Sequence, residues 1–265
     1  MTGTALAPGA APVSPPIPDD LDAVLRRMRF PYLRKAAPGI LATARAQRWD
    51  PAEVVRILLE EEIRGRDEAG RRNRRKTAGL PAGKTFASWR EHDSSIPLPA
   101  QHALATLEWV TRAENLCVAG PSGTGKSHFA EALAHQAIDA GMRVAWFTLE
   151  SLTAVIGRAA VDGTAAKAIA KITRCDLIAV DDIGMLPAGQ AAAEALYRLA
   201  DAAYERRSLI VTSNLHPSGL DTIMPKTLAT ATVDRLLHHA HLVITEGKSL
   251  RLAEATAGKG VTPLT

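Results

Sequence analysis

The chain has 265 residues, a formal net charge of +4 and 46% hydrophobic residues, but only 4% aromatic residues. This length accommodates one α/β domain and a smaller module. The low aromatic content argues against base-stacking platforms as the main contact with nucleic acid. The two cysteines form no disulfide framework or metal-ligand spacing, and neither a signal pattern nor 18 consecutive apolar residues occur. We therefore expect a cytoplasmic protein with no membrane span.

The N-terminal quarter divides into a tail and a helical module. Residues 1–18 are rich in Ala, Pro and Gly without periodicity, which predicts a disordered tail. Apolar residues then recur at helical spacing, with interruptions at Pro31 and at Pro38-Gly39. Asp50-Pro51 predicts the start of a further amphipathic helix. Residues 19–76 are therefore expected to form a small all-α module.

The end of this module is strongly basic. Between positions 64 and 90 there are nine Lys and Arg residues against two acidic ones, an excess that favours a phosphate backbone or another acidic surface. A solvated helix end would look the same in sequence. The DNA-binding candidates are Arg64, Arg66, Arg71, Arg72, Arg74, Arg75 and Lys76.

The rest of the chain reads as a linker, a domain and a tail. Residues 77–99 hold several Gly and Pro residues with Phe86 and Trp89 as apolar anchors, which predicts a linker. Over residues 100–252, short apolar runs alternate with helical patterns, and this predicts a parallel sheet covered by helices on both faces. Residues 253–265 form a C-terminal tail.

A phosphate-binding loop follows the first apolar run of this domain. Residues 120–127 read GPSGTGKS and fit G-x-x-x-x-G-K-[ST] at every fixed position. Glycines let the backbone N–H groups turn toward phosphate oxygens, Lys126 adds a cation, and Ser127 offers a hydroxyl to Mg²⁺. The motif predicts a nucleoside triphosphate and Mg²⁺ as ligands, and the family resemblance given below implies that the nucleotide is ATP. The residues expected to bind the nucleotide are Gly120, Pro121, Ser122, Gly123, Thr124, Gly125, Lys126, Ser127 and His128.

Two later strand ends complete the predicted site. The run 177–182 has four apolar residues followed by Asp181, a candidate Mg²⁺ ligand, and Asp182, a candidate activator of the attacking water. Asn214 ends another apolar strand and could sense the γ-phosphate. A strand that simply ends in turn residues is the alternative in each case.

A third group lies near the C-terminus. Arg235 falls on a helix before the last strand, where it could reach the γ-phosphate of a neighbouring subunit. A surface ion pair with Asp234 or Glu246 is the alternative. His238, His239 and His241 lack a carboxylate or thiol at metal-ligand spacing, so we expect structural histidines.

The combination resembles a known family. The loop 120–130, the strand end 180–184, the run 204–214 and the segment 234–241 are similar to those of the IstB family of insertion-sequence ATP-binding proteins, which are related to DnaC-type helicase loaders among the AAA+ ATPases. The resemblance implies an AAA+ sheet and an ATPase that forms homo-oligomers on double-stranded DNA. It also implies assistance to a cognate transposase in target selection and DNA transposition.

Three other functions fit parts of the sequence. A helicase loader of the DnaC type would have the same ATPase core. A small-molecule P-loop kinase would need an acceptor pocket and a lid whose arginines cover the phosphates. Arg235 instead falls late in the chain, on a helix suited to the site of a neighbouring subunit. A nucleotide-binding protein without hydrolysis would retain Lys126 but would not turn over ATP.

Overall fold

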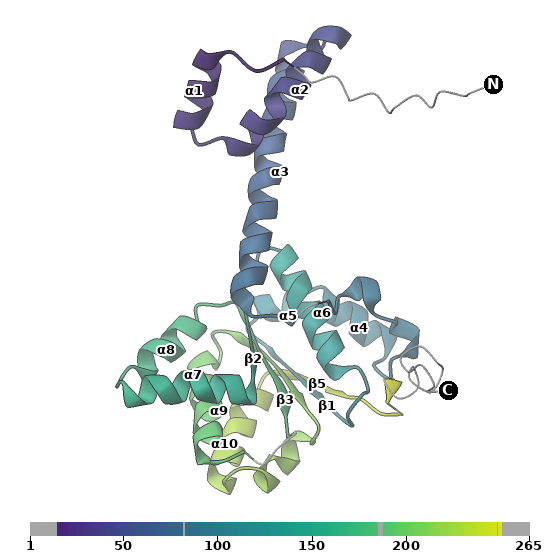
Figure 1. The fold of residues 1–265 in the computed structure, drawn as a ribbon. Coiled ribbons are helices and arrows are strands. Elements are labelled where there is room, and N and C mark those ends of the chain that lie inside the picture. The colour runs from purple at the N-terminus through teal and green to yellow at the C-terminus, as the bar shows by residue number, and fades with distance from the viewer. Residues whose placement is uncertain (1–14, 82, 185–187, 248, 251–265) are drawn as a thin grey trace, which may run out of the picture. The chain divides into compact units, whose positions relative to one another are not determined.

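The computed structural model describes residues 15–81, 83–184, 188–247 and 249–250. The chain divides into two compact units, residues 1–72 and 73–265 (Figure 1). Most of the predicted N-terminal tail and all of the predicted C-terminal tail lie outside the described residues. In the described ranges, no helix is long and apolar enough to cross a membrane.

The first unit is built from helices α1 (Asp19–Arg27), α2 (Pro31–Gln47) and the first part of α3 (Pro51–Ala78). Its small core contains Leu25, Leu33 and Ala37. Asp50 caps α3 by accepting a hydrogen bond from the backbone N–H of Ala52 at 2.9 Å, as Asp50-Pro51 predicts. The all-α prediction is confirmed.

Helix α2 differs from the prediction because it continues through Pro38 and Gly39. Proline removes one helical hydrogen bond and crowds the preceding turn. Leu33 and Ala37, on either side of that turn, are 6% and 1% exposed. Burial of this apolar face outweighs the local cost, so proline does not end the helix here.

The second unit contains a five-stranded parallel sheet in the order β2-β3-β4-β1-β5. The strands are β1 (Asn115–Ala119), β2 (Val144–Thr148), β3 (Leu177–Ile183), β4 (Ser208–Ser213) and β5 (Ala240–Ile244). Neighbouring residues of a strand enter opposite cores: Leu116 and Val118 belong to one, Cys117 to the other. This is the doubly covered sheet that the apolar runs predict.

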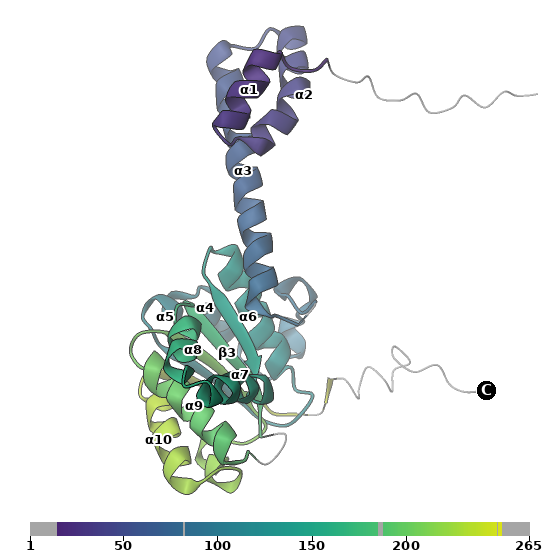
Figure 2. The ribbon, with the colours of Figure 1, turned by 60° about the vertical axis from the view of Figure 1, so that its left-hand side comes forward.

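Helices cover both faces of the sheet (Figures 1 and 2). One core contains residues of α4 (Leu98–Ala105), α5 (Glu108–Thr111) and α6 (Lys126–Asp139). The opposite core contains residues of the remaining four α-helices: α7 (Leu149–Val161), α8 (Ala165–Ile172), α9 (Gln190–Ala203) and α10 (Lys226–Leu237). A three-layer P-loop sheet of this kind places ligand loops at the carboxyl ends of its strands.

The segment predicted as a linker takes part in the first of these cores. It contains two short 3₁₀ turns, η1 (Phe86–Ser88) and η2 (Glu91–Asp93). Ile96 is 1% exposed, and Phe86 and Trp89 pack against the same cluster. These apolar side chains attach the segment to the sheet's helical layer, although its Gly and Pro residues are typical of a spacer.

Candidate nucleotide-binding site

The loop between β1 and α6 has a backbone that only glycine adopts readily. Gly120, Gly123 and Gly125 have φ angles of +146°, +85° and +93°. A Cβ atom on Gly120 would lie 2.1 Å from the backbone oxygen of Thr245. Both the dihedral angle and the close approach of the next segment therefore require glycine at position 120.

Lys126 is the first residue of α6 and lies close to the loop that precedes it. Its ammonium group donates hydrogen bonds to the backbone oxygens of Gly120 and Pro121, each at 2.7 Å. The residue is only 5% exposed. These contacts fix a positive charge at the loop and at the positive end of the α6 dipole, an arrangement that favours an anion.

Thr124 and Thr245 join the loop to the segment after β5. The Thr124 hydroxyl donates to the Pro121 oxygen at 2.9 Å and lies 2.7 Å from the Thr245 hydroxyl. The backbone N–H of Thr245 donates to the Ala119 oxygen at 2.7 Å. No sequence motif marks Thr245, because only the pairing of β5 with β1 brings it to the loop.

Asp181 and Asp182 occupy different environments at the end of β3. Asp181 is 7% exposed and accepts a hydrogen bond from the Thr212 hydroxyl, whereas Asp182 is exposed. The Asp182 backbone N–H donates to the same hydroxyl at 3.0 Å. Asp182 has a φ of +59°, and the β3–β4 register shifts between Val180 and Ile183. The local bend thus points one carboxylate inward and one toward solvent. The hydroxyl of Thr212, which no sequence motif marks, contacts both residues.

Asn214 directly follows β4, the strand that lies between β1 and β3. Its backbone N–H donates to the Ile183 oxygen at 3.0 Å. On the other side of β4, the Gly120 N–H donates to the Ser213 oxygen at 3.1 Å. The three predicted strand ends therefore meet at one edge of the sheet, on adjacent strands about 5 Å apart.

Aromatic side chains from the segment before α4 lie beside the loop. The Trp89 ring is 5.1 Å from the His128 ring, and its nearest atoms are 3.1 Å from where a Gly125 Cβ would be. The His128 Nε2 atom lies 3.2 Å from the Ser88 hydroxyl. Ser127, the second residue of α6, is half-buried. Ser127 ends the motif in the sequence and His128 directly follows it, whereas Trp89 is marked there only as an apolar anchor.

Carboxylate and hydroxyl oxygens are the ligands that Mg²⁺ prefers. Asp181 and Ser127 supply one of each at the carboxyl edge of the sheet. The donor set therefore fits this ion, and the deep position of Asp181 keeps its carboxylate away from bulk water.

Arg235 lies at the opposite edge of the sheet from the loop. The backbone oxygen of the next residue, Leu236, accepts a hydrogen bond at 3.0 Å from the Asn115 side chain. Asn115 is the first residue of β1, whereas the phosphate loop follows the last residue of this strand. The Arg235 side chain donates to Asp201 at 2.6 Å and lies over the Tyr197 ring at 5.2 Å. The Asp201 carboxylate raises the pKa of Arg235. The chain does not bring Arg235 to its own phosphate loop.

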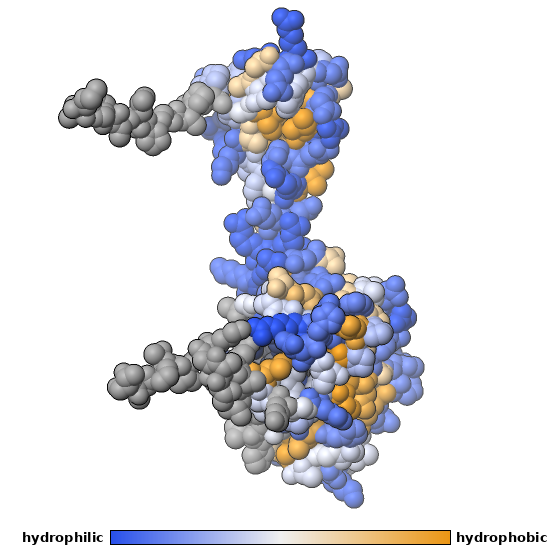
Figure 3. Space-filling model, turned by 90° about the vertical axis from the view of Figure 1, so that its right-hand side faces the viewer, coloured by the Kyte–Doolittle hydropathy of each residue, from blue (hydrophilic) through white to orange (hydrophobic). Residues whose placement is uncertain are grey.

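The seven basic candidates on α3 divide into two groups. Three have acidic partners: Arg64 pairs with Glu61, Arg66 with Glu62 and Arg75 with Asp139. Across the described ranges, no acidic group lies within ion-pair distance of the other four, which are Arg71, Arg72, Arg74 and Lys76. The face of α3 visible in Figure 3 is hydrophilic over this stretch. Arg66 also donates to the Arg29 backbone oxygen at 2.6 Å, which indicates a role in holding the helical unit together.

Relatives of the chain match it over most of its length. An insertion sequence IS21 ATP-binding protein of Pseudomonas aeruginosa is 32% identical over 237 residues, which cover 89% of each protein. An IS21-like ATP-binding protein of Bacteroides fragilis is 31% identical and covers 86% of this chain and 87% of its own length. Matches of this length extend over both the helical unit and the sheet of this chain.

The fold is similar to that of solved AAA+ proteins. DnaA from Aquifex aeolicus bound to AMPPCP has a TM-score of 0.51 and 20% identity over 68% of this chain and 56% of its own. The family profile described as IstB-like ATP binding protein matches residues 23–257. By this match and by its relatives, the chain belongs to the IstB-like family of insertion-sequence ATP-binding proteins, with the parallel sheet of an AAA+ protein.

Proposed function

We propose that the chain is an ATPase that binds ATP and Mg²⁺, forms homo-oligomers on double-stranded DNA and assists a transposase in DNA transposition. The observation that carries the ATPase assignment is the meeting of three strand ends, those that bear Lys126, Asp181-Asp182 and Asn214, at one edge of the sheet. The proposal rests on this geometry and on the family of the chain.

Each residue of the site has a role suited to its surroundings. Lys126 and the glycine loop hold the phosphates, and Asp181 and Ser127 coordinate Mg²⁺. Asp182, which is exposed next to the buried Asp181, activates the attacking water. Asn214 contacts the γ-phosphate, and Arg235 of one subunit stabilises the transition-state charge at the site of its neighbour.

The test separates nucleotide binding from hydrolysis. The ATP affinity and turnover of the full chain are measured with and without duplex DNA for wild type, Lys126→Ala, Asp182→Asn and the surface control Lys226→Ala. Lys126→Ala is expected to lose ATP binding. Asp182→Asn is expected to bind ATP but to turn it over about 100-fold more slowly, because a general base contributes at least that factor.

Two results would contradict this assignment. Asp182→Asn turning over ATP at the wild-type rate would remove Asp182 from the reaction. A wild-type chain that hydrolyses no ATP with DNA and transposase present would make the protein a nucleotide-binding switch without hydrolysis. Lys226 is exposed on α10, so Lys226→Ala controls for the loss of a charge elsewhere.

The DNA-binding part of the proposal rests on α3. Arg72 and Lys76 are four residues apart on this helix, and both belong to the group without an acidic partner among the described residues. Like charges at this spacing destabilise an isolated helix by about 0.2–0.5 kcal/mol per pair. A polyanion such as the DNA backbone relieves this repulsion, and contacts with phosphates alone fit a protein with little sequence preference.

Salt dependence tests this assignment. Duplex affinity is measured against salt concentration for wild type, Arg71→Ala/Arg72→Ala and the control Arg26→Ala, an exposed arginine of α1 paired with Asp22. The double variant is expected to lower the slope of log affinity against log salt by about two, or one per phosphate contact. An unchanged slope would exclude these two arginines from the DNA interface.

Assistance to a transposase is the part of the proposal that the relatives support, because their names place them in insertion sequences. We expect the chain to raise the frequency of transposition by the transposase of the same element, and Lys126→Ala to abolish that increase. The alternative is a helicase loader. Co-purification of a replicative helicase, with no effect on transposition, would favour that function instead.

A further inference from the structure

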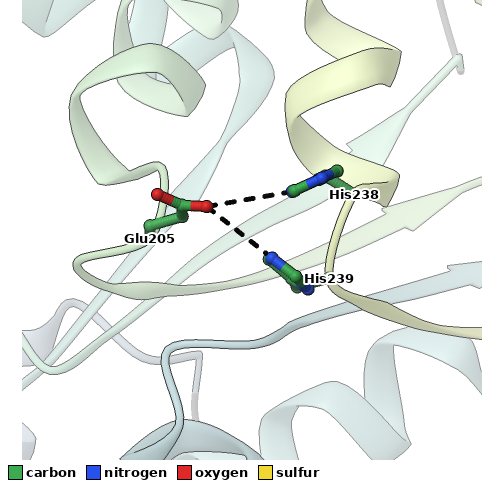
Figure 4. A group of neighbouring side chains, drawn as sticks. All are labelled: Glu205, His238 and His239. Carbon is green, nitrogen blue, oxygen red and sulfur yellow. Dashed lines mark ion pairs between the residues drawn. The ribbon is translucent and has the colours of Figure 1, made fainter.

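Three potential metal ligands from two distant segments meet at the end of α10. His238 caps the C-terminus of this helix and His239 follows it, while Glu205 lies in the turn between α9 and β4 (Figure 4). One donor atom from each residue can be chosen so that all lie within 4.8 Å of one another. In the described part of the chain, no other group of His, Cys, Asp and Glu residues meets this criterion.

We propose that Glu205, His238 and His239 bind a divalent transition-metal ion, most suitably Zn²⁺. Two imidazoles and one carboxylate are the donor set of three-ligand zinc sites. The sequence gives no reason to expect it, because the carboxylate lies 33 positions before His238 and only the fold brings it to the histidines.

The distances are close to those that a metal requires. A Glu205 oxygen lies 3.7 Å from His239 Nε2 and 4.0 Å from His238 Nδ1. Ligands bonded to zinc at about 2.0–2.1 Å in a tetrahedral arrangement are about 3.4 Å apart. All three donor atoms lie within 4.8 Å of one another, so small movements of these exposed side chains complete the site.

The surroundings favour a cation and allow it to enter. The site lies at the C-terminal end of a helix of 12 residues, where the backbone dipole is negative. The three side chains are 51–56% exposed, so an ion reaches them directly from solvent. With three protein ligands, one position remains for water or for a donor from another molecule.

Tyr204 makes the proposal more specific. Its hydroxyl lies 2.8 Å from His238 Nδ1, the atom that faces the carboxylate. This hydrogen bond holds the ring when no metal is bound and competes with a metal for the same nitrogen. Removal of the hydroxyl is therefore expected to strengthen metal binding, whereas it would weaken a cluster that serves only to hold the turn together.

Arg235 lies one turn before the histidines on the same helix. A bound ion would tie the end of α10 to the turn at Glu205 and so limit the movement of this part of the helix. Metal binding itself depends neither on ATP nor on DNA, and its test is independent of the proposed function.

The experiment uses the full chain without a polyhistidine tag and without nucleotide or Mg²⁺. Co²⁺ is titrated and followed by its visible absorption, which reports coordination by imidazole and carboxylate, and Zn²⁺ affinity is then measured by competition with a chelator. The variants are His239→Ala, Glu205→Gln and Tyr204→Phe. The control is His92→Ala, which removes an exposed histidine that lies 3.5 Å from a single carboxylate, that of Glu91.

We expect one ion per wild-type chain. His239→Ala and Glu205→Gln should each weaken binding at least about tenfold. His92→Ala should leave the affinity unchanged, and Tyr204→Phe should bind the ion more tightly than wild type. The proposal is overturned if wild type shows no saturable binding, if His239→Ala binds as tightly as wild type, or if Tyr204→Phe loses the ion. Circular dichroism of every variant confirms that the fold is retained.

Discussion

Arg235 is held by Asp201 of its own chain, at 2.6 Å between Nε and the carboxylate. The side chains are 28% and 52% exposed. Partly exposed ion pairs contribute only about 0–1 kcal/mol, so the pair can open at little cost. In the proposed oligomer, Arg235 exchanges this carboxylate for the γ-phosphate bound to a neighbour. Asp201 is then a competitor of the nucleotide for the same guanidinium.

The first prediction concerns this competition. Arg235→Ala should leave ATP binding intact but reduce turnover about 1,000-fold, because an arginine at the transferred phosphate contributes at least that factor. Asp201→Asn should raise turnover at low protein concentration, since Arg235 loses the carboxylate that holds it within its own chain. ATPase rates over a range of protein concentrations test both, with Arg198→Ala, an exposed arginine of α9, as the control. A fall in turnover for Asp201→Asn would mean that the pair positions Arg235 for reaction.

The second prediction concerns the phosphate loop. Gly120→Ala would place a Cβ atom 2.1 Å from the Thr245 backbone oxygen, at a φ of +146°. Such backbone strain costs about 1–3 kcal/mol before the overlap is counted. We therefore expect a loss of at least about 2 kcal/mol in the free energy of unfolding in urea, with loss of ATP binding.

A matched glycine provides the control for this experiment. Gly157 lies within α7 and has no atom within 4 Å of an added Cβ. Gly157→Ala should be neutral or should stabilise the protein by up to about 1 kcal/mol, because alanine favours a helix interior. Equal effects of the two substitutions would contradict the close approach of Thr245 to the loop.

The third prediction separates a structural arginine from the DNA-binding candidates. Glu62 is 3% exposed and accepts hydrogen bonds from the backbone N–H groups of Tyr32 and Leu33, each at 2.9 Å, and from Arg66 at 2.7 Å. Burial raises the pKa of Glu62, but these hydrogen bonds outweigh it and the net shift is downward. The carboxylate therefore ties the start of α2 to α3.

Loss of this carboxylate should destabilise the helical unit. Hydrogen bonds to a charged group contribute about 1.5–3 kcal/mol, and we expect Glu62→Gln to lower the unfolding free energy of the unit by about that amount. Arg66→Ala should also destabilise it, whereas Arg72→Ala should weaken DNA binding without changing stability. Thermal unfolding and duplex affinity, measured together, check the distinction. DNA binding that falls with Arg66→Ala at unchanged stability would return Arg66 to the DNA interface.

Much of the sheet and its site could be predicted from the sequence, because the motifs that mark them are local. A glycine loop, two carboxylates and an asparagine each follow an apolar run, and parallel strands bring such ends to one edge. The contacts of Thr212 and Thr245 could not be predicted, because they depend on which strands are neighbours. Strand order is a property of the whole fold.

The other differences arise from tertiary packing. Pro38 remains inside α2 because burial of the adjoining residues outweighs a local cost. Asp201 has its partner on α10 and Glu205 has its partner directly after this helix, each more than 30 positions away. A sequence pattern shows which residues are charged, but the partner of each charge is set by how α9 and α10 lie against each other.

The last prediction concerns acid stability. Glu114, the residue before β1, accepts a hydrogen bond from Arg112 at 2.7 Å and lies 2.8 Å from His241 Nε2 on β5. The Arg112 hydrogen bond and then that of His241 lower the pKa of Glu114 to about 2. In the unfolded chain the pKa returns to the ordinary value of about 4.3, so the folded state favours the ionised form.

This stabilisation is fully present above the unfolded pKa and disappears as the pH falls from about 5 to about 2. The side chain is 26% exposed, so solvent reduces the effect. We expect the difference in unfolding free energy between wild type and Glu114→Gln to be constant near neutral pH and to shrink steadily below about pH 5. Glu108→Gln, which removes a 73% exposed carboxylate 3.5 Å from the same arginine, is the control and should show a much weaker dependence. A difference that does not change between neutral and acidic pH would show that Glu114 gains nothing from its position between Arg112 and His241.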